Sequence, residues 1–287
     1  MPFDPGVPLL EHIATMLPSL RPSERQVANT VSEDAAFVVA STMAAVAEAA
    51  GVSEPTVMRF CTSLGFDGFQ QFKLALAQSL ALGLPSTLSA ISAEDSVSEL
   101  ATKVFDHTIS SLDRTRRYLD AVSLGAAIDA ILGATSMTVA GLGASGVIAL
   151  DVEQKAVLFG VPCSVPSDSH QQFMAAALAE PGQVFLVVSN TGSTSTILQI
   201  ARRARDNGAT VVAITGDETS ELAGIADVTI AVKTFEDTDR DTPTVSRIAS
   251  LVIVDVLATA VSLRRGAAHA ARLASMKEQL AAFRRLT

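Results

Sequence analysis

Hydrophobic residues follow two different periods along the chain. Up to about residue 120 they recur three and four residues apart, the spacing of an amphipathic helix, and no strand pattern interrupts them. This spacing predicts helices over residues 9–17, 21–33, 42–50, 53–63, 69–82 and 97–119. Residues 83–95 are rich in Ser and contain Gly83 and Pro85, which predicts a linker before the last of these helices.

From residue 121 onward, short continuous apolar runs alternate with helical patterns. The runs predict strands over residues 137–142, 162–165, 184–188, 210–215 and 227–232. The helical patterns predict helices over residues 144–159, 171–179, 194–206, 220–224, 243–264 and 270–285. Apolar strands separated by helices form a parallel sheet that is covered on both faces. We therefore expect a doubly wound, five-stranded parallel sheet in the flavodoxin-like order 2-1-3-4-5.

Together the two patterns predict an α/β protein with an all-α N-terminal domain. A length of 287 residues fits about two domains of roughly 150 residues each. We predict a helical domain at 1–82, a linker and connector helix at 83–120, and a sheet domain at 121–287. The long helices predicted at 243–264 and 270–285 are candidate subunit contacts.

Residues 43–62 have the pattern of a helix–turn–helix. Gly51 supplies the positive φ of the turn, and Ser53 is a good N-cap for the second helix. The apolar stripe expected to bury that helix consists of Val57, Phe60, Cys61 and Leu64. In DNA-binding proteins of this type the second helix lies in the major groove.

Burial of that stripe leaves polar residues on or near the outer face of the second helix. The candidate DNA contacts are Ser53, Glu54, Thr56, Arg59, Thr62 and, further along the chain, Lys73. Arg59 is the best base-reading candidate, because a guanidinium can hold guanine with two hydrogen bonds. Lys73 is a candidate phosphate contact. The competing interpretation is a plain helical hairpin in which Arg59 is a solvated charge.

The charge balance argues against tight DNA binding by a single copy. The whole chain has a net charge of −9, and residues 1–82 carry four basic against eight acidic side chains, a net charge of −4. Phosphate contacts normally supply most of a protein's affinity for DNA. We therefore expect two copies at each DNA site, with phosphate contacts from backbone N–H groups and helix N-termini.

Two of the predicted strands end in loops of small and hydroxyl residues, Gly141–Gly146 and Ser189–Thr194. In the expected strand order these strands are neighbours, so both loops open on one crevice where the order reverses. Loops of this kind before a helix direct N–H groups and hydroxyls at a phosphate. The candidate ligand-binding residues are Gly143, Ser145, Ser189, Asn190, Thr191, Gly192, Ser193 and Thr194.

The first loop also matches the GxGxxG pattern of dinucleotide-binding proteins, and Asp168 lies about where the ribose-binding acid is expected. The intervening strand is short and bracketed by Pro162 and Pro166, and this interpretation leaves the second loop without a role. Dinucleotide binding is therefore the weaker alternative. Another alternative is that both loops are purely structural, tight turns whose hydroxyls cap the helices that follow.

The run Val52–Cys61, followed by Leu64–Phe66 and Phe69–Lys73, resembles the DNA-reading head of the RpiR family of bacterial transcriptional regulators. That family pairs the head with a C-terminal sugar isomerase (SIS) domain, which binds phosphorylated sugars. Gly141–Ser145 and Ser189–Thr194 resemble the two ligand loops of the SIS domain. The resemblance implies operator DNA and a phosphorylated sugar as partners. It also implies that Ser145 and the hydroxyls of Ser189, Thr191 and Thr194 hold the ligand.

Segments near the C-terminal end resemble the HexR-type branch of that family. They are Glu236–Asp239, Thr242-Pro243, Ser246–Ile248, Asp255–Leu257 and Leu263–Gly266. The branch implies 2-keto-3-deoxy-6-phosphogluconate, the sugar acid phosphate of the Entner–Doudoroff pathway, as effector. The branch often has Gly-Arg-Thr in the phosphate loop, whereas Ser193 holds the middle position here.

Several other polar features have simpler interpretations. Arg114, Arg116 and Arg117 are expected to form a solvated face of the connector helix. Thr242 and Pro243 are expected to begin the helix over 243–264, and the acids just before them favour its N-terminus.

No cofactor, metal or catalytic group is indicated. No spacing of His, Cys and acidic residues suggests a metal site, and the two cysteines fall in separate predicted domains, as is typical of a reducing compartment. The start has no secretory pattern, and Ser250, Asp255 and Ser262 interrupt the longest apolar segment, so we expect a cytoplasmic protein.

The sequence therefore predicts a transcriptional regulator of sugar metabolism, a homodimer or homotetramer whose operator binding responds to a phosphorylated sugar or sugar acid. The alternative is a sugar-phosphate isomerase with a helical appendage. That reaction needs a base beside the sugar, for which Glu153, His170 or Glu180 qualify by residue type.

Overall fold

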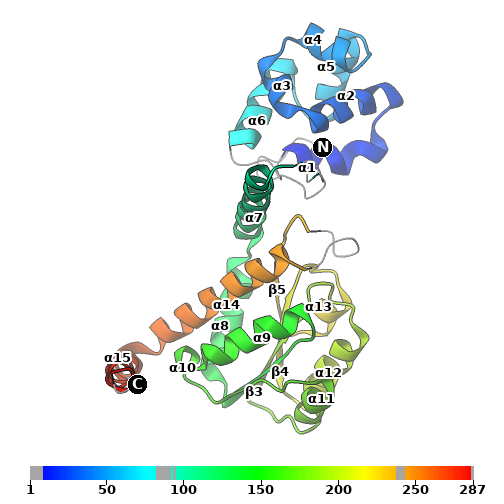
Figure 1. The fold of residues 1–287 in the computed structure, drawn as a ribbon. Helices are drawn as coiled ribbons and strands as arrows, with labels where there is room; N and C mark the ends of the chain where they lie inside the picture. The colour runs from blue at the N-terminus through cyan, green and yellow to red at the C-terminus, as the bar shows by residue number, and fades with distance from the viewer. Residues whose placement is uncertain (1–8, 82–91, 93–94, 237–242, 286–287) are drawn as a thin grey trace. The chain divides into compact units, whose positions relative to one another are not determined.

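The computed structural model describes residues 9–81, 92, 95–236 and 243–285, and the chain divides into two units between Ser110 and Ser111 (Figure 1). The first unit is helical and the second contains the sheet, as the two hydrophobic periods predict. The predicted linker over 83–95 lies mostly outside the described residues.

Short helices build the first unit. They are α1 (Leu9–Met16), the 3-10 turn η1 (Leu17–Ser19), α2 (Pro22–Glu33), α3 (Ala35–Ala40), α4 (Met43–Ala49), α5 (Glu54–Ser63) and α6 (Phe69–Ala81), followed by α7 (Val97–Tyr118), which runs into the second unit. The predicted helices are confirmed within two residues at each described end. Helix α3 is additional: Asp34 ends α2, and its side chain accepts a hydrogen bond from Phe37 N at 2.7 Å, which starts the new helix.

Aromatic residues hold the helix–turn–helix against α6. The ring of Phe72 meets those of Phe60 and Phe66 edge to face, with centroids 5.5 and 5.6 Å apart. Cys61 lies in the same core, where burial raises the pKa of its thiol to about 12, so the thiol stays neutral and packs as an apolar group. This core fixes α5 with its polar face outward.

The second unit is built on a parallel sheet. Its strands are β1 (Ser136–Ala140), β2 (Cys163–Ser164), β3 (Gln183–Val188), β4 (Thr210–Thr215) and β5 (Val228–Ala231), in the order β2-β1-β3-β4-β5. The predicted strand order is therefore confirmed. Ala140, the last residue of β1, pairs with Val187 of β3, so both strands end at the same level of the sheet. That pairing brings the two predicted ligand loops side by side.

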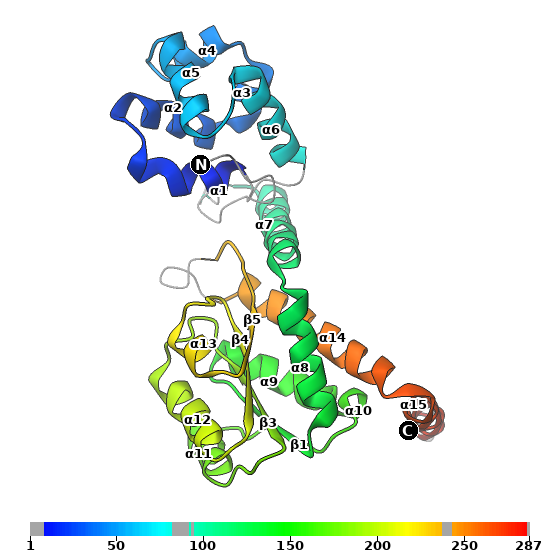
Figure 2. The same cartoon turned by 180° about the vertical axis from the view of Figure 1, so that it is seen from behind.

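Helices cover both faces of this sheet (Figures 1 and 2). One layer contains α8 (Ala121–Gly133), α9 (Ala144–Gln154), α10 (Ala156–Phe159) and α14 (Val245–Arg264), and the other contains α11 (Ser169–Ala177), α12 (Ser195–Asp206) and α13 (Glu221–Ile225). The last helix, α15 (Gly266–Phe283), buries none of its residues.

Two helix predictions in this unit need correction. Helix α8 was not predicted, because the segment 121–133 is apolar on most sides and has little amphipathic period. The single helix predicted over 144–159 is two, since the backbone leaves the helical conformation at Lys155.

By length and composition alone, helix α14 is long and apolar enough to cross a membrane. Half of its apolar stretch is buried inside the second unit. It packs on α8, α9 and α10 around the core residues Ile253, Leu257 and Val261. Its apolar character is therefore that of a core helix.

Of the three arginines expected on a solvated face of α7, Arg116 is exposed, as predicted, whereas Arg114 and Arg117 are half-buried. Arg114 places its guanidinium 4.4 Å from the centroid of the Phe235 ring, a cation–π contact. Arg116 and Arg117 both pair with Asp113. Thr115 donates from Oγ1 to Lys233 O at 2.8 Å, and Phe235 N donates to Ser111 Oγ at 3.3 Å. The C-terminal part of α7 is thus attached to residues 233–235, which follow β5.

Candidate functional site

A cavity of about 160 Å³ opens at the carboxyl ends of β1 and β3. Its lining consists of Leu142, Ala144, Ser145, Ile148, Val188, Ser189, Asn190, Thr191, Thr194, Ile197, Pro243, Ser246, Arg247 and Ser250. The two predicted loops and the first turns of α14 therefore share one pocket. Ligand pockets of drug-sized molecules span roughly 300–1,000 Å³, so this one suits a small polar metabolite.

The loop Ser189–Thr194 is fixed from behind by strand β4 and the segment after it. Ser189 N donates to Ile214 O at 3.0 Å, Gly216 N donates to Asn190 O at 2.9 Å, and Leu222 N donates to Gly192 O at 2.9 Å. These bonds use one N–H group, that of Ser189, and two carbonyl groups of the loop, those of Asn190 and Gly192. Its shape is therefore set by backbone contacts.

Other N–H groups of the same loop remain open. Within the described part of the chain, no hydrogen bond is recorded for the backbone N–H of Asn190, Thr191 or Thr194, or for those of Ser195 and Thr196 in the first turn of α12. Thr194 is the N-cap of α12 but makes no side-chain capping bond. Free N–H groups at a helix N-terminus carry a partial positive charge and bind anions. The loop therefore has the open N–H groups that the predicted phosphate site requires.

Gly192 allows the loop to approach β4 closely. Its φ is +60°, and a Cβ at this position would lie 2.2 Å from Ser220 Oγ and 2.9 Å from Thr215 Oγ1. Gly141 is constrained in the first loop, where a Cβ would lie 2.7 Å from the carbonyl oxygen of Ser145. Both loops therefore depend on glycine for steric reasons.

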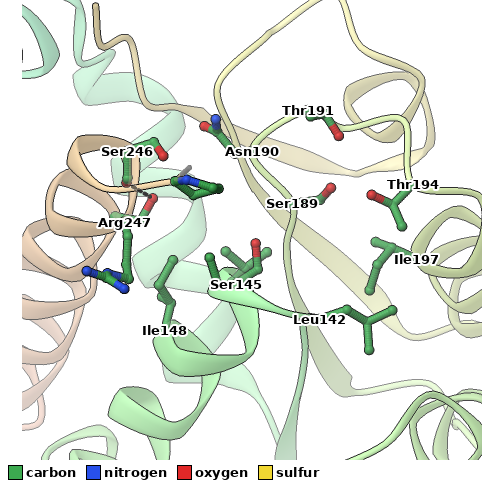
Figure 3. A pocket seen from close by; sticks show the side chains of 14 residues that line it. Leu142, Ser145, Ile148, Ser189, Asn190, Thr191, Thr194, Ile197, Ser246 and Arg247 are labelled. Atoms are coloured by element: carbon green, nitrogen blue, oxygen red, sulfur yellow. Dashed lines mark hydrogen bonds between the residues drawn. The ribbon is translucent and has the colours of Figure 1, made fainter. Parts of the chain in front are cut away.

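Hydroxyl groups face the cavity from both loops. Figure 3 shows Ser189, Thr191 and Thr194 on one side, with Ser145 below them. Across the described chain, no hydrogen bond is recorded for the hydroxyls of Ser145, Ser189 and Thr194. They are available to a ligand.

Arg247 lies at the opposite edge of the cavity (Figure 3). It is the one charged side chain among the described residues that line the pocket, and no carboxylate of the described chain pairs with it. Arg247 is half-buried, and in Figure 3 its guanidinium points away from the hydroxyl loops, so contact with a ligand requires a change of rotamer. A second position for negative charge therefore exists only when Arg247 turns toward the cavity.

The N-terminus of α14 is already occupied by a carboxylate of the protein. Glu236 accepts hydrogen bonds from the backbone N–H groups of Thr244, Val245 and Ser246, the last at 2.9 Å. The prediction that an acid stabilises this N-terminus is therefore confirmed for Glu236. Thr242 lies outside the described residues, and the helix begins at Val245, not at Pro243.

The structure brings most of the predicted ligand residues to the cavity. Ser145, Ser189, Asn190, Thr191 and Thr194 line it. Three others lie beside it: Gly143 has φ +58° at the start of α9, Gly192 packs on Ser220, and Ser193 is exposed.

The polar lining residues that the sequence did not select lie on α14. Ser246, Arg247 and Ser250 come from a segment more than fifty residues after the second loop. The only sequence signal for them was the resemblance of Ser246–Ile248 to the HexR-type branch.

The residues behind the alternative interpretations lie elsewhere. Asp168, the proposed ribose-binding acid, is the N-cap of α11, and its side chain accepts a hydrogen bond from Gln171 N at 3.0 Å. Glu153, His170 and Glu180 are exposed and belong to other parts of the surface than the pocket lining.

In the first unit, α5 presents the predicted DNA-reading face. Glu54, Arg59 and Thr62 are exposed. Ser53 occupies the N-cap position, as predicted, but its hydroxyl does not cap the helix; it shares a hydrogen bond of 3.1 Å with Thr56 Oγ1. Thr56 is only 4% exposed.

Lys73 of α6 bridges two helices. Its Nζ donates to the carbonyl oxygen of Ser41, just before α4, at 2.6 Å, and lies 5.7 Å from the centroid of the Phe69 ring. The ammonium group has three N–H donors, so two remain for a phosphate.

Comparison with known proteins identifies both units. Residues 7–83 match the helix-turn-helix domain of the rpiR family, and residues 130–260 match the SIS domain. The HTH-type transcriptional regulator HexR of Pseudomonas aeruginosa is 39% identical over 272 residues, which cover 95% of this chain and 95% of that protein. HexR of Escherichia coli (strain K12) is 39% identical over 272 residues, covering 95% of this chain and 94% of that protein.

Among solved structures, the Vibrio vulnificus NanR protein complexed with ManNAc-6P has a TM-score of 0.60 at 22% identity. The similarity covers 96% of this chain and 98% of that chain. It shows that the two proteins share the same fold.

Substitution of Gly192 tests whether the loop depends on its close packing. We expect Gly192→Ala to lower the free energy of unfolding by about 1–3 kcal/mol, because alanine is strained at positive φ and its Cβ would overlap Ser220. Gly125→Ala in α8, where no atom lies within 4 Å of the new Cβ, is the matched control and should stabilise by about 0.5–1 kcal/mol. Urea unfolding followed by circular dichroism measures both. Equal stabilities of Gly192→Ala and the wild type would contradict this account.

Proposed function

The chain belongs to the RpiR family of HTH-type transcriptional regulators, and on that premise we propose that it binds an operator under the control of a phosphorylated sugar acid. We assign DNA reading to residues 1–82, effector binding to residues 121–287 and the connection to residues 83–120. The observation that carries the proposal is the open N-terminus of α12, which meets the hydroxyl-lined cavity.

The phosphate of the effector binds at the loop Ser189–Thr194. A phosphate dianion accepts hydrogen bonds on three oxygens, and the loop and first turn of α12 offer several free N–H groups together with the hydroxyls of Ser189 and Thr194. Ser145 of the neighbouring loop lies below the same space (Figure 3), and we assign it to the sugar. Carbonyl groups would repel an anion, and those of Asn190 and Gly192 are bonded on the other side of the loop, to Gly216 N and Leu222 N.

Arg247 extends the proposal from sugar phosphates to sugar acid phosphates. A guanidinium opposite the phosphate site suits a carboxylate, which it can hold with two parallel hydrogen bonds. The second helix N-terminus at the pocket, that of α14, is satisfied by Glu236. The two anionic groups of the ligand therefore bind at α12 and Arg247. The best candidate is 2-keto-3-deoxy-6-phosphogluconate, which has a phosphate and a carboxylate at opposite ends.

Operator binding rests on the exposed face of α5. Arg59 provides a guanine contact, while Ser53 and Thr62 lie near it for phosphate or base contacts. Glu54 is an acceptor that can meet the amino group of cytosine. Because residues 1–82 have a net charge of −4, one head binds weakly, and two heads on a partly palindromic site supply the affinity.

A second copy of the chain has a surface available on α15. This helix buries none of its residues within one chain, and Leu280 and Phe283 are 42% and 62% exposed. An isolated helix of this length is marginal in water. A homodimer or homotetramer that covers α15 and the end of α14 would stabilise it and pair the DNA-reading heads.

The effector pocket and the connector helix share a segment. Glu236 holds the first turn of α14, which lines the pocket, and residues 233–235 just before it bond to Ser111, Arg114 and Thr115 of α7. An effector changes an equilibrium only through its different affinity for two arrangements. Movement of the first turn of α14 on ligand binding is therefore passed to α7 through residues 233–236.

A mobility-shift titration tests the whole proposal. We expect the wild type to retain a genomic operator fragment at low salt, and a phosphorylated sugar acid to change that retention. Arg59→Ala should abolish specific retention and leave effector binding intact, while Ser189→Ala should do the reverse, because their sites lie in separate units. The regulator interpretation would be refuted if the protein retained no genomic fragment, or if no phosphorylated sugar changed the retention. Turnover of keto and aldo sugar phosphates would favour an isomerase.

Arg247→Gln tests the class of effector. Calorimetry on the wild type should show tighter binding of 6-phosphogluconate and 2-keto-3-deoxy-6-phosphogluconate than of glucose 6-phosphate, which lacks the carboxylate. In the variant, the affinity for the two sugar acid phosphates should fall about 10- to 150-fold, the effect of one charge-assisted contact. Its affinity for glucose 6-phosphate should be unchanged. Arg203→Gln on the exposed side of α12 is the matched control. An equal loss for all three ligands would refute the carboxylate contact.

Thr115→Val tests the connection to α7. The change removes the hydroxyl that bonds to Lys233 O, and Thr102→Val, at an exposed position of the same helix, is the control. We expect Thr115→Val to bind effector within about 3-fold of the wild type, but the ratio of operator affinities without and with effector should fall toward one. An undiminished ratio in Thr115→Val would exclude this route.

A further inference from the structure

Three side chains on α5 and its N-cap form a continuous chain of hydrogen bonds. Arg59 donates from Nη2 to Thr56 Oγ1 at 3.0 Å, and Thr56 Oγ1 shares a hydrogen bond of 3.1 Å with Ser53 Oγ. The three residues are spaced three apart, so they lie along one side of the helix. Thr56, the central residue of these three, is the one that DNA cannot reach.

Thr56 is 4% exposed, whereas Ser53 and Arg59 on either side of it are exposed. A base edge or phosphate therefore meets Ser53 and Arg59 but not the hydroxyl between them. The sequence grouped Thr56 with the DNA contacts because it lies near the outer face of the helix. Its burial assigns it a different role.

We propose that Thr56 is a positioning residue for DNA reading, which holds Arg59 ready for a guanine and Ser53 ready for a phosphate. The proposal rests on the proposed operator binding and adds the reason for its specificity. A free arginine carries about 2 kcal/mol of rotamer entropy. Anchoring one of its five N–H donors on Thr56 removes part of that cost before DNA arrives and leaves four donors, enough for the two acceptors of guanine.

The direction of the hydrogen bonds links the two contacts. Because Arg59 donates to Thr56 Oγ1, the hydroxyl hydrogen of Thr56 is free to point to Ser53 Oγ. Ser53 then keeps its own hydroxyl hydrogen for a phosphate oxygen. A cation at one end of such a chain polarises the hydroxyls that follow and makes the last one a better donor. Base reading at Arg59 and phosphate contact at Ser53 are therefore coupled through Thr56.

The test compares Thr56→Val, which keeps the shape and removes the hydroxyl, with Thr56→Ser, which keeps the hydroxyl. Affinities of the full chain for an operator and for a scrambled duplex are measured at one fixed salt concentration. We expect Thr56→Val to weaken operator binding about 5- to 150-fold, the range for one base contact, with the scrambled duplex nearly unchanged. Thr56→Ser should recover operator affinity to within about 3-fold of the wild type.

The same substitution in an Arg59→Ala background isolates the coupling. There Thr56→Val should change operator affinity less than about 2-fold, because the group that it positions is gone. Equal losses for operator and scrambled duplex, or the same loss with and without Arg59, would overturn the proposal in favour of a structural role. Operator binding by Thr56→Val as tight as that of the wild type would also overturn the proposal. A wild type that binds no DNA would instead refute the proposed function itself.

Discussion

The effector pocket depends on how the backbone of Ser189–Thr194 is tied to strand β4. Hydrogen bonds from Gly216 and Leu222 use the carbonyls of the loop, and Gly192 fits against Ser220 only because it has no side chain. The N–H groups of Asn190, Thr191 and Thr194 and the hydroxyls of Ser189 and Thr194 are left for the cavity. The proposed anion site is thus made largely of backbone atoms held by the sheet, and backbone N–H groups bind a phosphate without identifying the molecule that carries it. Selectivity for the remainder of the ligand has to come from the opposite side, which α14 provides.

The two helix N-termini at the pocket are used differently. That of α12 is open, whereas Glu236 occupies that of α14. The carboxylate of Glu236 fills the anion position at the N-terminus of α14, so the proposed second contact with the ligand falls to Arg247, which has a full charge and a directional fork of donors. The same carboxylate joins the pocket wall to residues 233–235 and so to α7. In the proposed function, Glu236 therefore has two effects. It excludes ligands with a second phosphate at α14, and it connects the pocket to α7.

Much of this architecture follows from the sequence, and the exceptions have physical causes. Continuous apolar strands separated by helices predict the sheet and its order, and that order alone brings the two loops together. Helix α8 was missed since a segment apolar on most sides shows no period, and α3 since six residues make less than two turns. Arg247 was not selected because no local pattern indicates that the start of α14 closes the crevice. Thr56 precedes Phe60 by one helical turn, so its side chain points to the same buried side as that ring.

The acidity of the DNA-reading head makes sense for a protein that must release its operator. With a net charge of −4 over residues 1–82, non-specific attraction to phosphates is weak, and a larger share of the binding free energy comes from a few oriented contacts. Coupling between two ligands is typically about 1–3 kcal/mol, or 5- to 150-fold in affinity. A head that bound DNA tightly through many lysines would stay bound after such a change. Under the proposed function, a head that depends on Arg59, positioned by Thr56, has little affinity from other contacts, so a change of this size decides whether it stays bound.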